Sequence, residues 1–128
     1  MPKLTHAARK QKMHRLQKWV AHKVAELTGL EYGKDCPIES RPSGETGPDV
    51  RLDNEARREF PFTVECKNQE TWSVSAWIEQ AKANTYSGTD WALIISKNRQ
   101  KTPVVVLDAE IFFNLLEQLR KLKRRRTI

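Results

Sequence analysis

Apolar residues in the first quarter of the chain recur every three or four positions, which is the spacing of one helix face. This spacing predicts an amphipathic helix over about residues 11–28, and Gly29 is placed to end it. Residues 30–42 contain two prolines and are expected to form a loop or a short strand. The apolar face of the predicted helix consists of Leu16, Trp19, Val20, Val24 and Leu27.

The middle of the chain changes to short runs that are typical of extended structure. Residues 50–52 predict one strand, and residues 60–68 predict the central strand of a sheet. The intervening residues 54–59 are polar and are expected to connect the two strands as a hairpin.

The C-terminal half alternates between helical and strand patterns. Ser73 can cap a helix over about residues 74–85, and residues 91–96 form an apolar run that predicts a strand buried on both faces. A second apolar strand is expected at residues 103–107, and Asp108 is expected to cap a final helix. The spacing within this helix predicts a buried stripe made of Ile111, Phe112, Leu115, Leu116, Leu119 and Leu122.

These elements predict an α/β fold with the order αββαββα, in which helices flank a central mixed β-sheet. A chain of 128 residues has room for one hydrophobic core. We therefore expect one domain over residues 1–128, with basic extensions at residues 1–14 and 120–128.

The net charge of +7 is distributed unevenly along the chain. Seven Lys or Arg residues lie within residues 1–25 and six within residues 120–126, and neither segment contains an acid. The residues between them carry the other ten cations and all 16 acids, which gives that part a charge of −6. Basic ends favour a polyphosphate partner, because each neutralised phosphate releases counterions.

Several classes of protein lack support in the sequence. No apolar stretch approaches the length of a membrane span, and the N-terminus has no hydrophobic segment of the signal-peptide type. We therefore expect a cytoplasmic protein without a membrane partner. No Walker-type loop is present, because residues 43–47 lack the Gly-Lys-Ser/Thr ending.

Two carboxylates and one ammonium provide candidate chemistry in the middle of the chain. On a strand, Glu65 and Lys67 share a face about 6.5–7 Å apart, and Cys66 points the other way into the core. Together with Asp49, Glu65 can hold Mg²⁺ against a phosphodiester, because Mg²⁺ binds through one or two carboxylates and substrate oxygens. The peptide carbonyl of Cys66 is a candidate further ligand, and Lys67 would orient the attacking water or offset developing charge.

The arrangement Pro48-Asp49 followed by Glu65-Cys66-Lys67 resembles the signature of the PD-(D/E)XK nucleases. The size and the element order resemble those of archaeal-type Holliday junction resolvases and related phage nucleases, over roughly residues 15–108. The resemblance implies a restriction-endonuclease-like core, Mg²⁺ as cofactor with Mn²⁺ able to substitute, and Asp49, Glu65 and Lys67 as catalytic residues.

The same resemblance implies a DNA substrate that is branched, such as a four-way junction, and a homodimer that makes paired nicks. Two alternatives stay open from the residues alone. One is a nuclease of the same fold with another DNA substrate, of a restriction-like or phage DNA-processing kind. The other is a non-catalytic DNA-binding protein, although retention of Asp49, Glu65 and Lys67 argues against it.

Further site residues follow from the resemblance. The resolvases usually carry a glutamate on the first helix, where this chain has Gln17, and Glu26 is the other candidate for that role. Gln80 resembles a glutamine that lies near the active site in this superfamily. The hydroxyl residue expected just before the aspartate is Ser43 or Thr46.

Basic residues near both ends and after the strand at residues 91–96 are candidate DNA contacts. The candidates are Lys10, Lys12, Arg15, Lys97, Arg99, Lys123, Arg124 and Arg125.

Overall fold

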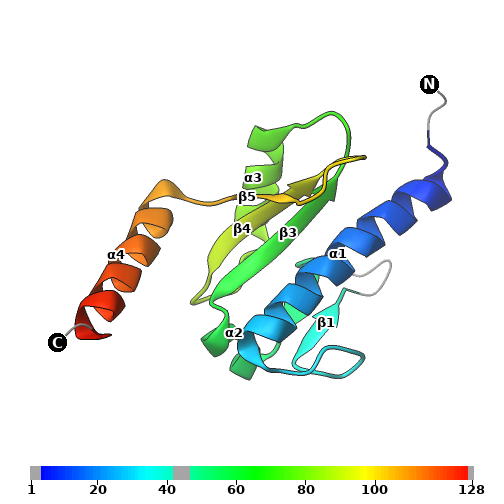
Figure 1. Cartoon of the computed structure of the whole chain (residues 1–128). Helices are drawn as coiled ribbons and strands as arrows, with labels where there is room; N and C mark the ends of the chain where they lie inside the picture. Colours follow the sequence, from blue (N-terminus) through cyan, green and yellow to red (C-terminus); the bar gives the residue numbers. More distant parts are fainter. Residues whose placement is uncertain (1–3, 42–46, 127–128) are drawn as a thin grey trace.

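The computed structural model describes residues 4–41 and 47–126, and within them the chain forms four helices and five strands. Figure 1 shows their arrangement. The elements are α1 (His6–Thr28), β1 (Ile38–Ser40), β2 (Val50–Leu52), α2 (Asn54–Glu59), β3 (Phe62–Asn68), α3 (Val74–Ala83), β4 (Asp90–Ser96), β5 (Val104–Val106) and α4 (Ala109–Arg126).

The strands form two sheets. β1 pairs with β2 in an antiparallel pair, and the other sheet has the order β3-β4-β5. β3 runs parallel to β4, whereas β5 runs antiparallel to it, so this sheet is mixed as the sequence predicts. The sheets and their flanking helices are compatible with a restriction-endonuclease-like α/β core.

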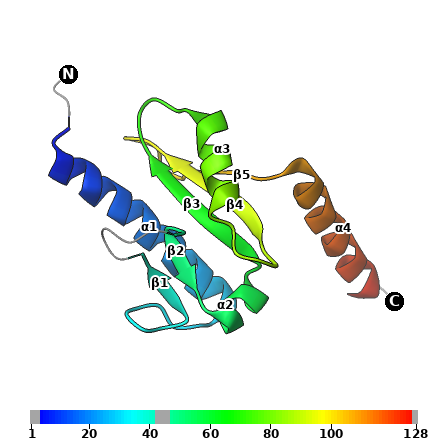
Figure 2. The ribbon, with the colours of Figure 1, turned by 180° about the vertical axis from the view of Figure 1, so that it is seen from behind.

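Helices lie on both faces of the three-stranded sheet, as the two opposite views in Figures 1 and 2 show. The apolar side of α1 packs with Val64 and Cys66 of β3, and also with the small sheet, in one core cluster. On the opposite face, Trp77 of α3 packs against Leu93 and Ile95 of β4 in a second cluster. The strand β3 is therefore held between α1 and α3.

The boundaries of the first helix differ from the prediction. α1 starts at His6 rather than near residue 11, because the Thr5 hydroxyl accepts a hydrogen bond from the Ala8 amide at 3.0 Å and caps the helix. The predicted end is correct, since Gly29 has a φ of 74° and its N–H donates to the Ala25 carbonyl. This left-handed conformation favours glycine at a helix end.

The predicted hairpin between residues 50–52 and 60–68 is wrong. Residues 54–59 form helix α2, because the Asp53 carboxylate accepts from the Ala56 amide at 2.9 Å and caps it. Strand β2 pairs with β1 rather than with β3. β3 is consequently an edge strand of its sheet, and the central position belongs to β4.

The predicted burial of the last helix is also wrong. Asp108 caps α4 as expected, accepting from the Glu110 amide at 2.9 Å, but α4 has no buried residue. Leu119 and Leu122 of the predicted stripe are 47% and 56% exposed. The helical period predicts the apolar face of α4 correctly. Burial of that face also requires another surface that packs against it. In Figure 1, α4 projects away from the sheet.

Membrane-spanning character is absent from the described helices. None of those within residues 4–41 and 47–126 combines the length with the apolar composition that a bilayer requires.

Candidate active site

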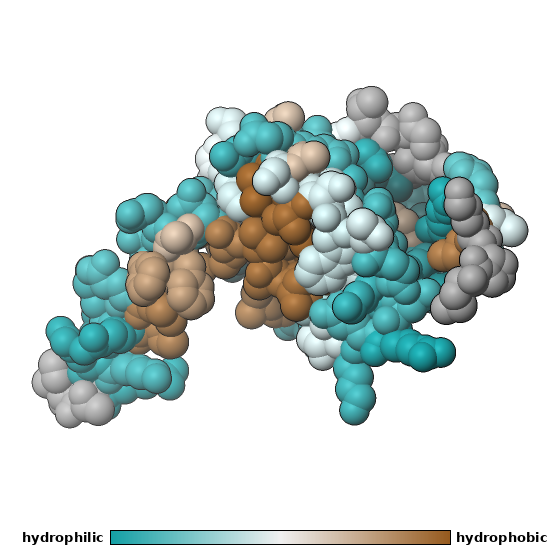
Figure 3. All heavy atoms as spheres, turned by 90° about the horizontal axis from the view of Figure 1, so that it is seen from above, coloured by the Kyte–Doolittle hydropathy of each residue, from teal (hydrophilic) through white to brown (hydrophobic). Residues whose placement is uncertain are grey.

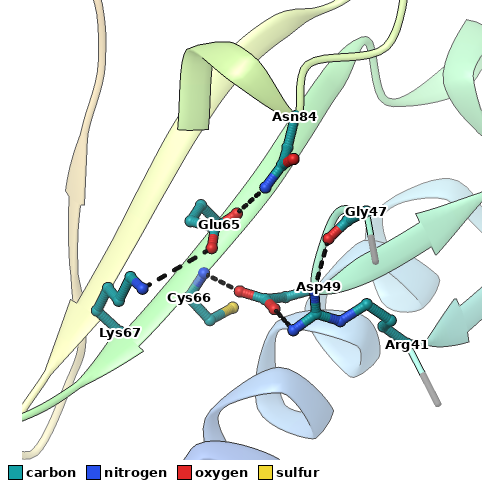
Figure 4. A network of polar contacts seen from close by, with 7 residues as sticks. All are labelled: Arg41, Gly47, Asp49, Glu65, Cys66, Lys67 and Asn84. Carbon is teal, nitrogen blue, oxygen red and sulfur yellow. Dashed lines mark hydrogen bonds and ion pairs between the residues drawn. The ribbon is translucent and has the colours of Figure 1, made fainter. Parts of the chain in front are cut away.

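Asp49 lies directly before β2 and is 2% exposed. Its Oδ1 lies 2.9 Å from Nη2 of Arg41, and Nη1 of the same guanidinium donates to the Gly47 carbonyl at 2.8 Å. The antiparallel pairing of β1 with β2 brings Arg41 beside Asp49, and the Arg41 amide also donates to the Asp49 carbonyl. Arg41 therefore fixes both the side chain and the backbone around Asp49 (Figure 4).

The second oxygen of Asp49 connects the small sheet to β3. Oδ2 accepts a hydrogen bond from the Cys66 amide at 2.7 Å. In an extended strand the N–H and C=O of one residue point to the same side. The Cys66 carbonyl therefore faces the edge of β3 that Asp49 approaches, while the Cys66 side chain is fully buried among the residues of α1.

Glu65 and Lys67 share the other face of β3, as the strand period predicts. Lys67 Nζ lies 4.0 Å from Glu65 Oε1, and the Glu65 side chain is 3% exposed. Asn84, the residue after α3, donates from Nδ2 to Glu65 Oε2 at 3.3 Å. Lys67 Nζ also lies 5.9 Å from the ring centroid of Trp77, so α3 contributes two residues around this pair.

The two carboxyl groups influence one another. Burial and the negative charge of Asp49 raise the pKa of Glu65 to about 7, against the opposing effects of Asn84 and Lys67. Burial also raises the pKa of Asp49, although the Cys66 amide and the Arg41 charge favour its ionised form. Asp49 has the shorter and stronger contacts, so Glu65 is the group of this pair that retains a proton more readily.

The donor set fits a hard divalent cation. Within residues 4–41 and 47–126, no three His, Cys, Asp or Glu side chains converge to hold a metal ion. Two buried carboxylates and one strand carbonyl offer oxygen atoms of the kind that Mg²⁺ prefers, and Mg²⁺ is commonly held by one or two carboxylates with waters and substrate phosphates. A cation there would offset the repulsion between Asp49 and Glu65. Burial keeps the Cys66 thiol neutral by raising its pKa far above the usual value, so it is a poor ligand.

The accessory residues predicted from the sequence lie in different surroundings. Gln17 is 6% exposed, on the face of α1 that packs against the sheets. Glu26 is exposed and lies 3.8 Å from Lys23, so the structure does not bring it to the two carboxylates. Gln80 is exposed on α3, and its main-chain carbonyl accepts from the Asn84 amide. The roles of Gln17 and Gln80 stay predictions.

Ser43 and Thr46, the predicted hydroxyl residues before Asp49, lie outside the described residues. Two residues that contact the carboxylates were not predicted from the sequence. Arg41 ends a region in which the sequence predicts a loop or a short strand, and Asn84 belongs to a polar helix end. No helix or strand period predicts either contact, since Arg41 depends on the pairing of β1 with β2 and Asn84 on the packing of α3 against β3.

The predicted DNA contacts include one residue that is buried. Lys12 Nζ lies 3.9 Å from Glu70, its side chain is 7% exposed, and its carbonyl accepts from Asn68 Nδ2. Lys12 therefore connects α1 to the end of β3, and its burial corrects the prediction that it contacts DNA. Lys97 is exposed and lies 5.9 Å from the Trp72 ring. The other candidates are exposed, namely Lys10, Arg15, Arg99, Lys123, Arg124 and Arg125.

Comparison with known proteins gives one family. The model of the family described as "Phage putative PDDEXK endonuclease" matches residues 8–128. No curated protein and no solved structure matches the chain.

Proposed function

The chain belongs to the phage PD-(D/E)XK endonuclease family, and from this premise we propose that it is a Mg²⁺-dependent DNA endonuclease that resolves branched DNA. The observation that carries the proposal is the convergence of Asp49 and Glu65, two buried carboxyl groups, with Lys67 beside them. We expect Mn²⁺ to substitute for Mg²⁺, and we place the reaction in the cytoplasm of the host cell.

Asp49, Glu65 and the Cys66 carbonyl would hold the cation. Once bound, it would polarise the scissile phosphate and lower the pKa of a coordinated water. Arg41 keeps Asp49 oriented through its contact at 2.9 Å, and Asn84 keeps Glu65 oriented through its contact at 3.3 Å. These two residues act as positioning residues.

Lys67 would act on the water and the phosphate. Its ammonium lies at the edge of the pair, 4.0 Å from Glu65, and its side chain is 13% exposed. From there it can donate a hydrogen bond to the attacking water or to a non-bridging phosphate oxygen as charge develops. Trp77 lies under Lys67 and restricts the directions in which the side chain can point.

Exposed cations would hold the DNA backbone. Lys97 and Arg99 lie in the turn after β4, next to the end of β3, where the Gln69 amide donates to the Ser96 carbonyl. Arg15 lies with His14 and Lys18 around a hollow of about 380 Å³ beside β1. These side chains can contact phosphates to either side of the carboxylates.

Branched DNA is the substrate that we favour, with a homodimer as the active form. Resolution of a four-way junction needs two nicks, and a two-fold dimer presents two identical sites. The second candidate is phage DNA processing on another DNA substrate, and the match to a phage endonuclease family supports it equally.

A cleavage assay tests the proposal. The wild type and Glu65→Ala are incubated with Mg²⁺ and a four-way junction, a Y-fork, a nicked duplex or a linear duplex of matched sequence. Glu79→Ala is the matched control, since Glu79 is an exposed acid on α3 that pairs with Lys82. Paired symmetric nicks on the junction alone, lost in Glu65→Ala and kept in Glu79→Ala, are the expected result.

The other outcomes separate the parts of the proposal. Cleavage of all four substrates would retain the nuclease and discard the junction preference. Binding without cleavage in either Mg²⁺ or Mn²⁺ would contradict the enzyme and leave a DNA-binding protein.

A further inference from the structure

Helix α4 exposes a continuous apolar face. Phe112, Leu116, Leu119 and Leu122 recur at the spacing of one helix side, and they are between 41% and 56% exposed. Phe113, next to this stripe, is 65% exposed. An exposed apolar patch of this kind marks an interaction site, because soluble proteins rarely leave such surface in water.

A groove on the body of the same chain has the same apolar character. It has a volume of about 300 Å³ and runs between α1 and the sheet. Figure 3 shows a hydrophobic surface on the body of the molecule, on the side from which α4 projects. Its walls include Trp19, Val24, Phe62, Ala92, Ile94 and Val105.

The groove exists because one sheet face is only partly covered. The helix α3 packs over the face that carries Leu93 and Ile95. On the opposite face α1 covers β3, whereas Val105 of β5 remains 54% exposed. The uncovered strip over β4 and β5 lies beside α1 and can accept one more helix.

We propose that α4 of a second copy of this chain occupies the groove, and that the two copies exchange their α4 helices around a two-fold axis. One chain carries both parts of the contact, an apolar helix and an apolar groove. A two-fold dimer satisfies both at once, because each copy gives its helix and receives the other's. Leu115 lines the groove of its own chain, so the two exchanged helices would meet there.

The path of the chain favours α4 of a second copy, rather than the chain's own α4, as the helix that occupies the groove. Only Leu107 and Asp108 separate β5 from α4, and Asp108 caps α4 at the point where the helix turns away from the sheet. The helix therefore leaves the sheet immediately, as Figure 1 shows. An arm that leaves its own body and exposes its apolar side is the arrangement of an exchanged element.

Charge at the two ends of the contact is complementary. Glu59 and Asp90 are exposed and adjoin Phe60 and Phe62 of the groove in sequence and in strand pairing, whereas Glu26 is paired with Lys23, a cation that lines the groove. The last turns of α4 carry Lys123, Arg124, Arg125 and Arg126. An acidic rim on the groove and a basic end on the helix favour one orientation of the partner's helix.

The proposed dimer rests on the proposed function only for its biological role, which is to supply two cleavage sites. Self-association is measured without DNA, so it can fail while the nuclease stands. Glu65→Ala is expected to associate as the wild type does.

Sedimentation velocity over a concentration series tests the inference. We expect the wild type to have the mass of two 14.9 kDa chains. Leu119→Glu in the helix and Trp19→Glu in the groove should each weaken association by about tenfold or more, because a charge would enter an apolar contact. Gln118→Glu, a polar position of α4, is the control and should associate normally. Circular dichroism checks that all variants fold.

Mixing the variants distinguishes the possible contacts. Leu119→Glu chains retain an intact groove and Trp19→Glu chains retain an intact helix, so the mixture should form dimers that neither variant forms alone. A monomeric wild type would contradict the proposal and indicate that α4 folds onto its own groove. Dimers that depend on Leu119 but not on Trp19 would also contradict it, since they would indicate pairing of α4 with α4.

Discussion

The side chain of Glu65 is buried next to a second carboxylate, an arrangement that disfavours ionisation of both. Burial and the charge of Asp49 raise the pKa of Glu65 to about 7. Such pairs concentrate at functional sites, because the repulsion between them is relieved by a bound cation. With the cation that we propose, the pair would link metal binding, pH and stability at one position.

Glu65 makes the stability of the metal-free protein depend on pH. Between the ordinary pKa of 4.5 and the folded value of about 7, the folded chain holds a proton that the unfolded chain has lost. Raising the pH through this window therefore lowers the free energy of unfolding, by a few kcal/mol at most. Added Mg²⁺ should raise the melting temperature more at pH 8 than at pH 6, because it binds the ionised pair. Thermal unfolding with and without Mg²⁺ measures both effects.

Glu65→Gln should weaken the pH dependence and the Mg²⁺ effect, since it removes the titrating group. Glu79→Gln on the exposed side of α3 should change neither. A melting temperature of the wild type that is independent of Mg²⁺ at pH 8 would contradict a cation site at Asp49 and Glu65.

Arg41 offsets the charge of Asp49. Arg41→Ala would leave a carboxylate that is 2% exposed without its cation partner, so we expect a loss of roughly 1–3 kcal/mol of stability. The loss should be smaller at low pH, where Asp49 can accept a proton. Arg58→Ala, an exposed position of α2, should change stability by less than about 0.5 kcal/mol in urea unfolding. Equal losses in the two variants would contradict this role.

Among the elements, α2 shows how a single cap can decide between a loop and a helix. Residues 54–59 are polar and lie between two strands, which is the usual position of a hairpin connection. Asp53 accepts from the Ala56 amide, and Ala56 is fully buried. The Asp at the cap and the alanine three residues later are the local signals that could have predicted the helix.

Loss of this cap should destabilise the protein. Asp53→Ala removes the acceptor for the Ala56 amide and should cost about 1 kcal/mol. Asn54→Ala, at the next and exposed position, serves as the control and should have little effect. Urea unfolding monitored by tryptophan fluorescence measures the difference, and equal stability of the two variants would contradict the capping role.

For the whole molecule, the sequence predicts what depends on local periods. The alternation along residues 62–68 places Glu65 beside Lys67 and buries Cys66, and the order of the longer elements is also correct. The pairing of β2 with β1 and the contacts of Arg41 and Asn84 depend on which elements pair or pack together, and no helix or strand period predicts that choice. The exposure of the apolar face of α4 could not be predicted for another reason. The helix projects away from its own sheet, and we propose that the surface that covers it belongs to a second copy of the chain.

The distribution of cations over the whole molecule should make DNA binding strongly dependent on salt. If Arg125 neutralises one phosphate, Arg125→Gln should lower the slope of log affinity against log salt concentration by about 0.9 for duplex arms. Lys82→Gln, whose side chain pairs with Glu79, is a control on the exposed side of α3. Fluorescence anisotropy with a labelled junction measures the slopes, and an unchanged slope for Arg125→Gln would remove α4 from the DNA interface.

The most direct test of the active site is single-turnover cleavage of a labelled four-way junction by Glu65→Gln in Mg²⁺. This substitution keeps the size of the side chain and removes the charge that would hold the cation. We expect a rate at least about 100-fold below that of the wild type, with junction binding retained. Cleavage by Glu65→Gln at the rate of the wild type would show that the reaction does not occur at Asp49, Glu65 and Lys67.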